Sequence, residues 1–319
     1  MEHPILPPEL FDLVIGHLAN DRATLIVASL TCRQFRHVCQ RLLFTTYRLS
    51  IRKLEDDPLS PPERLLKTLE TSPHLASCIH TLVVGNASDN ESCESQDRLF
   101  DKLKLPLVYA QVKKLKRLEV NGTSSFRPTW SAIPFQSGLP SNRCDLGRVL
   151  PITHLSLRKI RDVPTSWLFT FPKLEELCMD WVATTDDPRL KQEFDAGSLP
   201  ICLKRIRLST THPTLIQLIL NNPNTFNLEA LEELSIMENL SNGPQGSTLS
   251  FLATLPAKAF TTLQRLEIDI DGYYLNPNSI SQVLDLRKFS SLRFLQVDWH
   301  GSGSLSVLIG WLEGFKNSQ

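Results

Sequence analysis

Cysteine and histidine are the residue types of this chain that could supply a nucleophile and a base. Cys39 lies two residues from His37, and His154 and Cys178 stand in neighbouring leucine-rich segments. A thiolate activated by an imidazole can attack an acyl group. Each pairing combines single residues from a chain with 8 His and 7 Cys, so coincidence is the simpler explanation. We therefore expect no catalytic residues.

Other motifs that carry enzymatic chemistry are missing from the sequence. It has no phosphate-binding loop, no dinucleotide fingerprint, no His-Glu-x-x-His and no Gly-x-Ser-x-Gly elbow. The stretch Gly301-Ser302-Gly303-Ser304 lacks a third glycine and a lysine, which favours a repeat loop over an anion site. The cysteines are scattered, without zinc-site spacing. We predict no metal and no cofactor.

Repeats organise most of the chain. The pattern Leu-x-x-Leu-x-Leu, with apolar residues at positions one, four and six, opens at Ile79, Leu115, Ile152, Leu174, Leu203, Leu231, Leu263 and Leu292. Each copy ends in the alternating pattern of a short strand, which buries too little apolar surface to be stable alone. Stacking the copies gives a solenoid, and solenoids are usually binding surfaces.

Helical segments alternate with these strands, which implies parallel pairing. They are predicted at residues 63–71, 97–104, 214–221, 247–255, 279–286 and 304–315. The predicted fold class is therefore α/β, with a parallel sheet of about eight strands. Residues 89–97 and 121–148 are expected to be inserted loops.

The spacing of the copies resembles that of leucine-rich repeat proteins. Successive copies open 36, 37, 22, 29, 28, 32 and 29 residues apart, against a usual ~20–29 residues. Only Leu231 to Asn239 completes the signature that ends in asparagine. The resemblance implies an irregular leucine-rich-repeat horseshoe.

Composition excludes several classes of partner. The 319 residues include 34 Lys and Arg against 34 Asp and Glu, so there is no bulk attraction to nucleic acid or to an anionic membrane. The N-terminus lacks a basic region followed by an apolar one, and no later apolar run approaches the ~18 residues of a membrane span. We expect no nucleic acid and no membrane as partners, and a cytoplasmic and/or nuclear protein that is not secreted.

Residues 6–44 have helical periodicity broken into three short pieces. Leu6-Pro7-Pro8-Glu9 is a helix start signal, Asn20 and Asp21 supply capping oxygens for a second helix, and Thr31 is expected to cap a third. Three helices of about ten residues cannot enclose a core by themselves. Their excess apolar surface implies a docked partner or a neighbouring domain.

The residues of these helices resemble an F-box. The resemblance rests on Leu6-Pro7-x-Glu9-Leu10, Val14-Ile15, Leu18, Thr24-Leu25, Ala28 and Leu30-Thr31-Cys32-Arg33-x-Phe35. Thr31 stands where the family often has Val, and Phe35 where it often has Trp. The resemblance implies docking onto the Skp adaptor, and through it onto a cullin. The implied contact residues are Leu6, Pro7, Glu9, Leu10, Val14, Leu18, Leu30, Cys32 and Phe35.

An alternative interpretation is that these residues pack the three helices together or against the repeats. The helices would then cap the solenoid, since terminal repeats need a shielded end.

Three regions are predicted along the chain. Residues 1–48 form the F-box helical module, and residues 63–319 form the irregular leucine-rich-repeat solenoid. Between them, residues 49–62 contain Asp56-Asp57-Pro58 and Ser60-Pro61-Pro62, a polar and proline-broken stretch that is typical of a linker.

The positions between the consensus apolar residues are expected to line the concave sheet face and to bind a protein substrate. The candidates are Arg117, Glu119, Glu176, Asp180, Arg205, Arg207, Glu233, Glu267, Asp269, Asp298 and Trp299. The acidic residues from Glu233 onward could select a basic target segment. Solvated surface charge is the favoured alternative, because Arg265 partly offsets them. Trp181 and Trp299 are candidate rim anchors, although packing explains them equally well.

These features predict a non-catalytic substrate-recognition subunit of a Skp, cullin, F-box ubiquitin ligase, which binds the adaptor at its N-terminus and an unidentified protein through its repeats. The alternative is an interaction scaffold outside any ligase.

Overall fold

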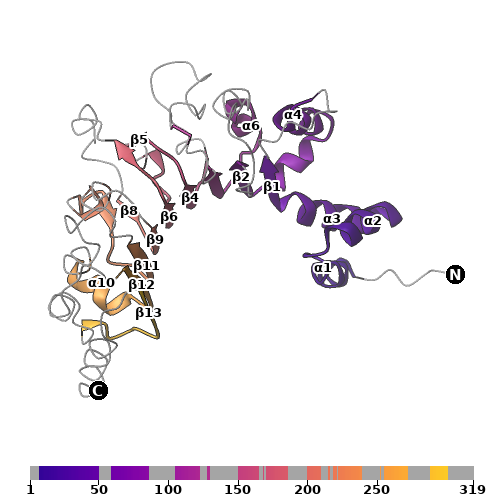
Figure 1. Ribbon diagram of the computed structural model, residues 1–319. Coiled ribbons are helices and arrows are strands. Elements are labelled where there is room, and N and C mark those ends of the chain that lie inside the picture. Colours follow the sequence, from indigo (N-terminus) through magenta and orange to yellow (C-terminus); the bar gives the residue numbers. More distant parts are fainter. Residues whose placement is uncertain are drawn as a thin grey trace. The chain divides into compact units, whose positions relative to one another are not determined.

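The chain divides into two compact units, one of residues Met1–Ser125 with Ala132–Ile152 and one of Phe126–Ser131 with Thr153–Gln319. The computed structural model (Figure 1) describes residues 7–49, 59–85, 105–122, 128–129, 150–164, 168, 170–185, 200–209, 215, 218–220, 222–238, 252, 255–271 and 288–300. The predicted boundary at residues 49–62 stays a prediction, because residues 50–58 lie outside the described part.

The first unit begins with three short helices, α1 (Pro8–Gly16), α2 (Arg22–Thr31) and α3 (Arg33–Thr45). Pro8 occupies the first position of α1, where its missing N–H has no intrahelical partner to lose. Asp21 caps α2 and accepts hydrogen bonds from the Thr24 N–H at 3.0 Å and the Thr24 hydroxyl at 2.6 Å.

The predicted cap of α3 was wrong by one residue. Cys32 caps this helix, since its Sγ accepts a hydrogen bond from the Phe35 N–H at 3.4 Å. Thr31 is the last residue of α2, and its hydroxyl donates to the Ala28 carbonyl of its own helix at 2.8 Å. The hydroxyl is therefore bonded within α2.

A small core joins the three helices. Ile15, Leu25 and Cys39 are buried at its centre. Phe11 and Phe35 meet edge to face, with ring centroids 5.4 Å apart. The partly buried residues around the centre are Leu18, Ala28, Phe35, Val38, Leu42 and Leu43.

The strands of the first unit are β1 (Thr46–Leu49), β2 (Thr81–Gly85) and β3 (Arg117–Asn121), parallel and in that order. The sequence pattern did not predict β1, which follows α3 without an intervening residue. The other described helices of this unit are α4 (Pro61–Thr71), the 3₁₀ helix η1 (Pro73–Ser77) and α6 (Leu105–Gln111).

In the second unit, six strands pair in parallel and in chain order. They are β4 (His154–Arg158), β6 (Glu176–Asp180), β9 (Arg205–Ser209), β11 (Glu233–Glu238), β12 (Arg265–Asp271) and β13 (Phe294–His300). Two short parallel pairs accompany them: β5 (Val163–Pro164) with β7 (Thr184–Thr185), and β8 (Ile201–Cys202) with β10 (Phe226–Asn227).

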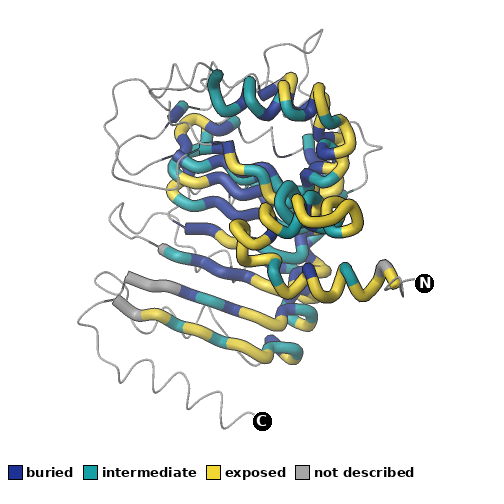
Figure 2. Tube along the Cα trace, turned by 90° about the vertical axis from the view of Figure 1, so that its right-hand side faces the viewer, coloured by how far each residue is buried: buried dark blue, intermediate teal, exposed yellow. Residues whose placement is uncertain are grey.

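The predicted repeat strands are confirmed. Each of the eight copies carries a parallel strand that begins two residues after the copy opens. The apolar residues at positions four and six, such as Leu118 and Val120 of β3, are buried, and only β13 has them partly exposed. Figure 2 shows this burial as dark blue segments that recur along successive strands. The α/β class with a parallel sheet is therefore confirmed, with β1 as an additional strand.

Backbone hydrogen bonds repeat from copy to copy at the start of each strand. The Glu175 carbonyl accepts the N–H groups of Lys204 and Arg205 at 2.8 and 3.0 Å, and the Glu232 carbonyl accepts those of Gln264 and Arg265 at 2.8 and 3.1 Å. The carbonyls of His80, Thr153, Lys204 and Gln264 do the same. This repeated contact aligns the side chains of neighbouring strands.

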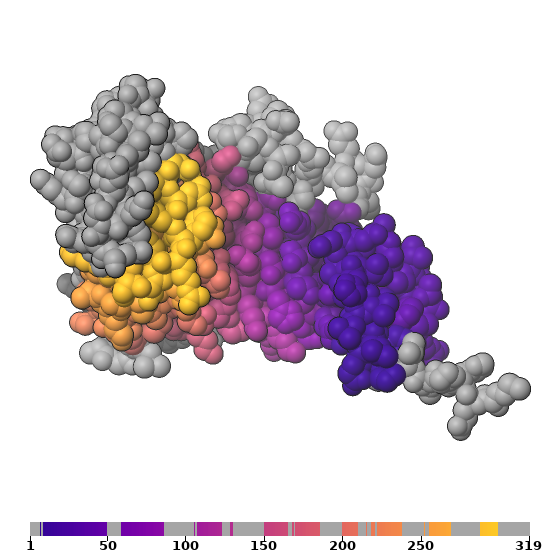
Figure 3. All heavy atoms as spheres, turned by 90° about the horizontal axis from the view of Figure 1, so that it is seen from below, coloured from indigo at the N-terminus to yellow at the C-terminus, as the bar shows by residue number. Residues whose placement is uncertain are grey.

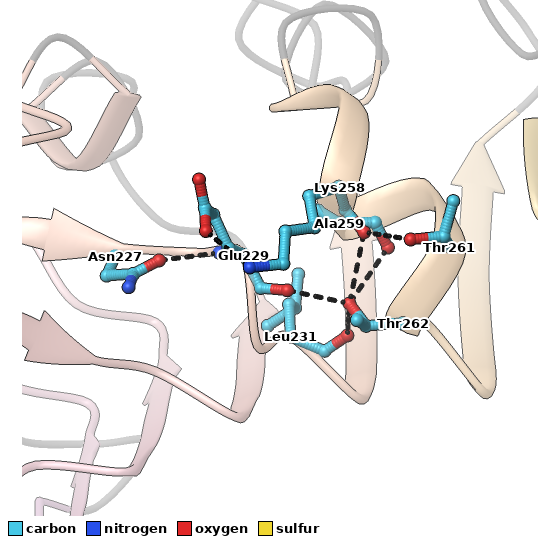
Figure 4. A network of polar contacts seen from close by, with 7 residues as sticks. All are labelled: Asn227, Glu229, Leu231, Lys258, Ala259, Thr261 and Thr262. Carbon is cyan, nitrogen blue, oxygen red and sulfur yellow. Dashed lines mark hydrogen bonds and ion pairs between the residues drawn. The ribbon is translucent and has the colours of Figure 1, made fainter.

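Helix α10 (Ala257–Thr262) is tied to the copy before it by polar contacts (Figure 4). The Thr262 hydroxyl lies 2.9 Å from the Leu231 carbonyl and 3.1 Å from the Glu229 carbonyl. Lys258 Nζ donates to Glu229 Oε2 at 2.8 Å. These contacts fix the helix against the strand start of β11.

Only some of the predicted helices lie in the described part of the chain. The helix expected at residues 63–71 is α4, which begins earlier, at Pro61, so that Pro61 and Pro62 belong to a helix. Residues 97–104, 279–286 and 304–315 lie outside the described part. Within 214–221 and 247–255, residues 215, 218–220 and 252 are helical. The predicted loop at 89–97 is not described, and of 121–148 only residues 121–122 and 128–129 are.

Candidate protein-binding surfaces

Helix α1 is apolar on two opposite faces. Ile15 and Phe11 point into the helical core. Leu10, Leu13 and Val14 lie on the other face at i, i+3 and i+4 spacing, and they are 42%, 63% and 60% exposed. Water-exposed leucine and valine at helical spacing indicate a surface for another apolar partner.

Helix α2 repeats this arrangement. Leu25 is buried and Ala28 packs against the same core. Ile26, Val27 and Leu30 form an outward stripe and are 45%, 61% and 75% exposed. The surface of the three helices is seen from one side in indigo in Figure 3. We call the six exposed residues of α1 and α2 the outward apolar stripes.

The predicted adaptor contacts differ in exposure and position. Leu10, Val14 and Leu30 lie on the outward apolar stripes, whereas Leu18 and Phe35 are half-buried in the helical core. Pro7, Glu9 and Cys32 are exposed, and Leu6 lies outside the described residues.

Leu13, Ile26 and Val27 were not among the predicted adaptor contacts. Their signal was present in the sequence, since each extends a second apolar stripe at i+3 or i+4 spacing from a predicted contact.

The strands of the second unit present rows of side chains set by their register. The row at position three of each copy contains His154, Glu176, Arg205, Glu233, Arg265 and Phe294. The row at position five contains Ser156, Cys178, Arg207, Ser235, Glu267 and Gln296. We call these rows the strand face. Small side chains such as Ser156 and Ser235 are buried between the longer ones.

Charges on the strand face alternate in sign. Glu176 Oε2 lies 3.3 Å from His154 Nε2 and 3.4 Å from Arg205 Nε. Glu233 is paired in register with Arg205 on one side and Arg265 on the other. In the first unit, Arg117 Nε lies 3.2 Å from Glu119 Oε1. These pairs are partly exposed, and ion pairs in contact with water each contribute little to stability, ~0–1 kcal/mol.

The C-terminal strands contain a second polar cluster. Arg265 Nε donates to Glu267 Oε1 at 2.8 Å, and its guanidinium carbon lies 4.2 Å from the centre of the Phe294 ring. Burial opposes the ionisation of Glu267, but hydrogen bonding and the positive charges of Arg265 and Arg207 hold its pKa below the usual value.

The acidic residues of the predicted patch have basic or polar neighbours. Glu233 and Glu267 are interleaved with arginines, and Asp298 accepts a hydrogen bond from Gln296 at 2.6 Å. The side chains of Asp269 and Trp299 lie outside the described part. Within the described strands, the alternation favours solvated, paired charge over a uniform negative field. Asp180 and Arg207 also lie on these strands.

Trp181, the other candidate rim anchor, is 39% exposed directly after β6. Its φ of 56° is rare for a residue with a side chain, and its N–H donates to the Ser209 carbonyl at 2.9 Å. Lys159 has the same conformation after β4, with a φ of 55°.

The structure describes the side chains of both candidate catalytic pairs. Cys39 is buried in the helical core, where desolvation raises the pKa of its thiol and disfavours the thiolate, while His37 is exposed. The two ring nitrogens of His154 contact Thr153 Oγ1 at 2.7 Å and Glu176 Oε2 at 3.3 Å. Within the described residues there is no cluster of three or more His, Cys, Asp or Glu suited to a metal ion.

Among the helices of the described part, none combines the length and the apolar character needed to cross a bilayer. No protein-family model matches the chain, and no curated protein is significantly similar to it.

Proposed function

We propose that this protein is a substrate-recognition subunit of a Skp, cullin, F-box ubiquitin ligase. The observation that carries the proposal is the pair of outward apolar stripes on α1 and α2. Three of the residues that the F-box resemblance assigns to adaptor contact, Leu10, Val14 and Leu30, lie on these stripes.

Apolar side chains that cluster on a protein surface mark interaction sites, and α1 and α2 each present a stripe of three. Here six large aliphatic side chains from two short helices are at least two-fifths exposed, although the helices already have a core of their own. Covering them with an adaptor would stabilise the complex by roughly 25 cal/mol for each Å² of apolar surface removed from water.

The strand face is the proposed site for a protein substrate. Its alternating charges and the exposed Phe294 suit recognition by complementary pairs around an aromatic contact. Of the candidate residues with described side chains, five lie on the strand face: Glu176, Arg205, Arg207, Glu233 and Glu267. Asp180 and Asp298 lie further along the same strands, while Arg117 and Glu119 lie on β3 of the first unit. The chain itself would be non-catalytic, and it would raise the effective concentration of the target beside the ubiquitin-transferring subunits.

The experiment is a binding measurement between the full chain and purified Skp adaptor. Wild-type protein is expected to form a 1:1 complex by size-exclusion chromatography and calorimetry. Leu30→Asp should abolish the complex, because a carboxylate would be desolvated in the apolar contact. Phe35→Asp is unsuitable as a test, since Phe35 packs in the helical core.

A matched control is Leu107→Asp on α6, another leucine that is 55% exposed. It should bind like the wild type. Failure of the wild-type chain to bind the adaptor, or equal binding by Leu30→Asp, would contradict the proposal.

A specific observation favours the second candidate, a scaffold whose helices cap the repeats. Helix α3 continues directly into β1, which pairs with β2, and the His80 N–H donates to the Thr45 carbonyl at 3.0 Å. The Gln40 side chain also lies 3.2 Å from His74 Nε2. A purely capping role predicts a monomer that does not bind the adaptor, so the same measurement distinguishes the two functions.

A further inference from the structure

The charges of the N-terminal region are strongly segregated. From residue 22 to residue 54 the chain contains no Asp or Glu. The basic residues in this stretch are Arg22, Arg33, Arg36, Arg41, Arg48, Arg52 and Lys53. A chain with equal numbers of acidic and basic residues overall therefore concentrates positive charge here.

Helix α3 carries the centre of this charge. Its inward residues include Phe35 and Cys39, while Arg33, Arg36 and His37 are exposed on the other side. Arg41 is paired with Asp12 at 3.1 Å. Among the described residues, no carboxylate lies within ion-pair distance of Arg33 or Arg36. We call Arg33, Arg36 and His37 the basic stripe.

The basic stripe does not stabilise helix α3. Arg33 is the first residue of α3, and the first turn contains no acidic residue. The positive end of the helix dipole lies there, so cations in this turn destabilise the helix, whereas cations in the last turn would stabilise it. The last turn has none. The stability of the helix therefore does not explain the arginines in its first turn.

We propose that the basic stripe is an electrostatic docking element for an acidic protein surface on the adaptor, beside the segment that covers the outward apolar stripes. This inference rests on the proposed function and specifies the charge of the partner. Leu30 and Arg33 are three residues apart, on either side of the Cys32 cap, so the outward apolar stripe of α2 ends close in the chain to where the basic stripe of α3 begins.

The exposed aliphatic residues and the basic stripe lie on different helices, which favours a protein over a membrane as the partner. Helices that lie on anionic bilayers carry their apolar and cationic faces on the same helix. Here the exposed aliphatic residues lie on α1 and α2, and the basic stripe lies on α3, which exposes no large apolar side chain. Exposed aliphatic residues beside the arginines also differ from the polar surface that nucleic acids select.

The experiment compares association kinetics of three full-length proteins with purified Skp adaptor across ionic strength. The test variant is Arg33→Gln/Arg36→Gln. The control is Lys113→Gln/Lys114→Gln, which removes two exposed cations elsewhere in the same unit. At ~50 mM salt the test variant should associate about three- to tenfold more slowly than wild type, and the difference should vanish near ~1 M. The control should match wild type within about twofold.

The melting temperature distinguishes a loss of electrostatic steering toward the adaptor from a loss of folded protein. Since the cations oppose the helix dipole, the test variant should melt at a temperature equal to or higher than that of wild type. Slower association with unchanged or raised thermal stability supports the inference.

Three outcomes overturn it. If wild type binds the adaptor and the test variant associates at the same rate at every salt concentration, this inference fails while the proposed function stands. If wild type does not bind the adaptor, both fail. Binding of wild type to phosphatidylserine vesicles that depends on Arg33 and Arg36, without salt-dependent adaptor binding, would assign the basic stripe to a membrane instead.

Discussion

At the scale of residues, burial separates side chains that the sequence does not distinguish. Leu25 and Leu30 belong to the same helix and to the same resemblance, yet Leu25 is 1% exposed and Leu30 is 75% exposed. The first stabilises the fold, and the second is available to a partner. Phe35 was predicted as an adaptor contact, but its ring meets Phe11 within the helical core.

This contrast gives a direct prediction for α2. Leu25→Ala should lower the free energy of unfolding by about 2–5 kcal/mol, because it leaves a cavity in a small core. Leu30→Ala should change it by less than ~0.5 kcal/mol, since the side chain is mostly in water. Urea unfolding followed by circular dichroism measures both. Similar losses for the two variants would show that Leu30 is packed.

Asp21 makes helix α2 sensitive to acid. Hydrogen bonds from the Thr24 hydroxyl and backbone N–H lower the pKa of Asp21 in the folded protein. A lowered folded pKa stabilises the protein above the unfolded pKa of ~3.9, and this contribution is lost as pH falls through the folded value. Asp21→Ala should therefore be destabilising at pH 7, and its difference from wild type should shrink below pH ~4.

Thermal melts across that pH range test the prediction. Asp21→Asn, which keeps a capping oxygen but cannot ionise, is the control. It should stay close to wild type at pH 7. A pH-independent effect of Asp21→Ala would assign the loss to something other than the carboxylate.

At the scale of elements, the repeat pattern predicts the strands closely, but it does not predict the backbone conformation at their ends. All eight copies place a strand at the same offset, so the period-two alternation was sufficient to find them. Lys159 and Trp181 adopt positive φ after their strands without the glycine that would signal it. The hydrogen bonds from Lys159 to Asp180 and from Trp181 to Ser209 hold these turns.

Gly85 at the end of β2 is the position where glycine is required. Its φ is +115°, and an added Cβ would lie 1.9 Å from the Asn121 carbonyl oxygen of β3. Gly85→Ala should therefore cost at least ~1–3 kcal/mol, from backbone strain plus separation of the two strands. Gly16→Ala in α1 is the matched control, because an added Cβ there meets nothing within 4 Å. It should be neutral or stabilising by up to ~1 kcal/mol.

At the scale of the molecule, each copy in a stacked array is stabilised by its contacts with the neighbouring copies. In the second unit, β9 lies between β6 and β11, and Leu208 of β9 is 1% exposed. Leu208→Ala should cost about 2–5 kcal/mol. Hydrogen exchange should accelerate in β6, β9 and β11 first, and least in β2 and β3 of the other unit.

Leu82→Ala in β2 provides the reciprocal control. Leu82 is fully buried between β1 and β3. Its substitution should accelerate exchange in those strands and leave β11 and β12 nearly unchanged. A uniform acceleration in both variants would show that the chain unfolds as a single cooperative unit.

The sequence by itself determined the eight parallel strands, their inward leucines and the three N-terminal helices. These follow from local periodicity, because positions two or about 3.6 residues apart share a face whatever surrounds them. Cap signals such as Pro8 and Asp21 likewise act within one turn.

Only the tertiary structure decided which apolar residues of those helices are exposed, that Thr46–Leu49 forms a strand, and that arginines interleave with Glu233 and Glu267. Each of these depends on contacts between residues distant in the sequence. Periodicity specifies that a helix has an apolar face, but when it has two, as α1 and α2 do, packing against α3 determines which one is buried.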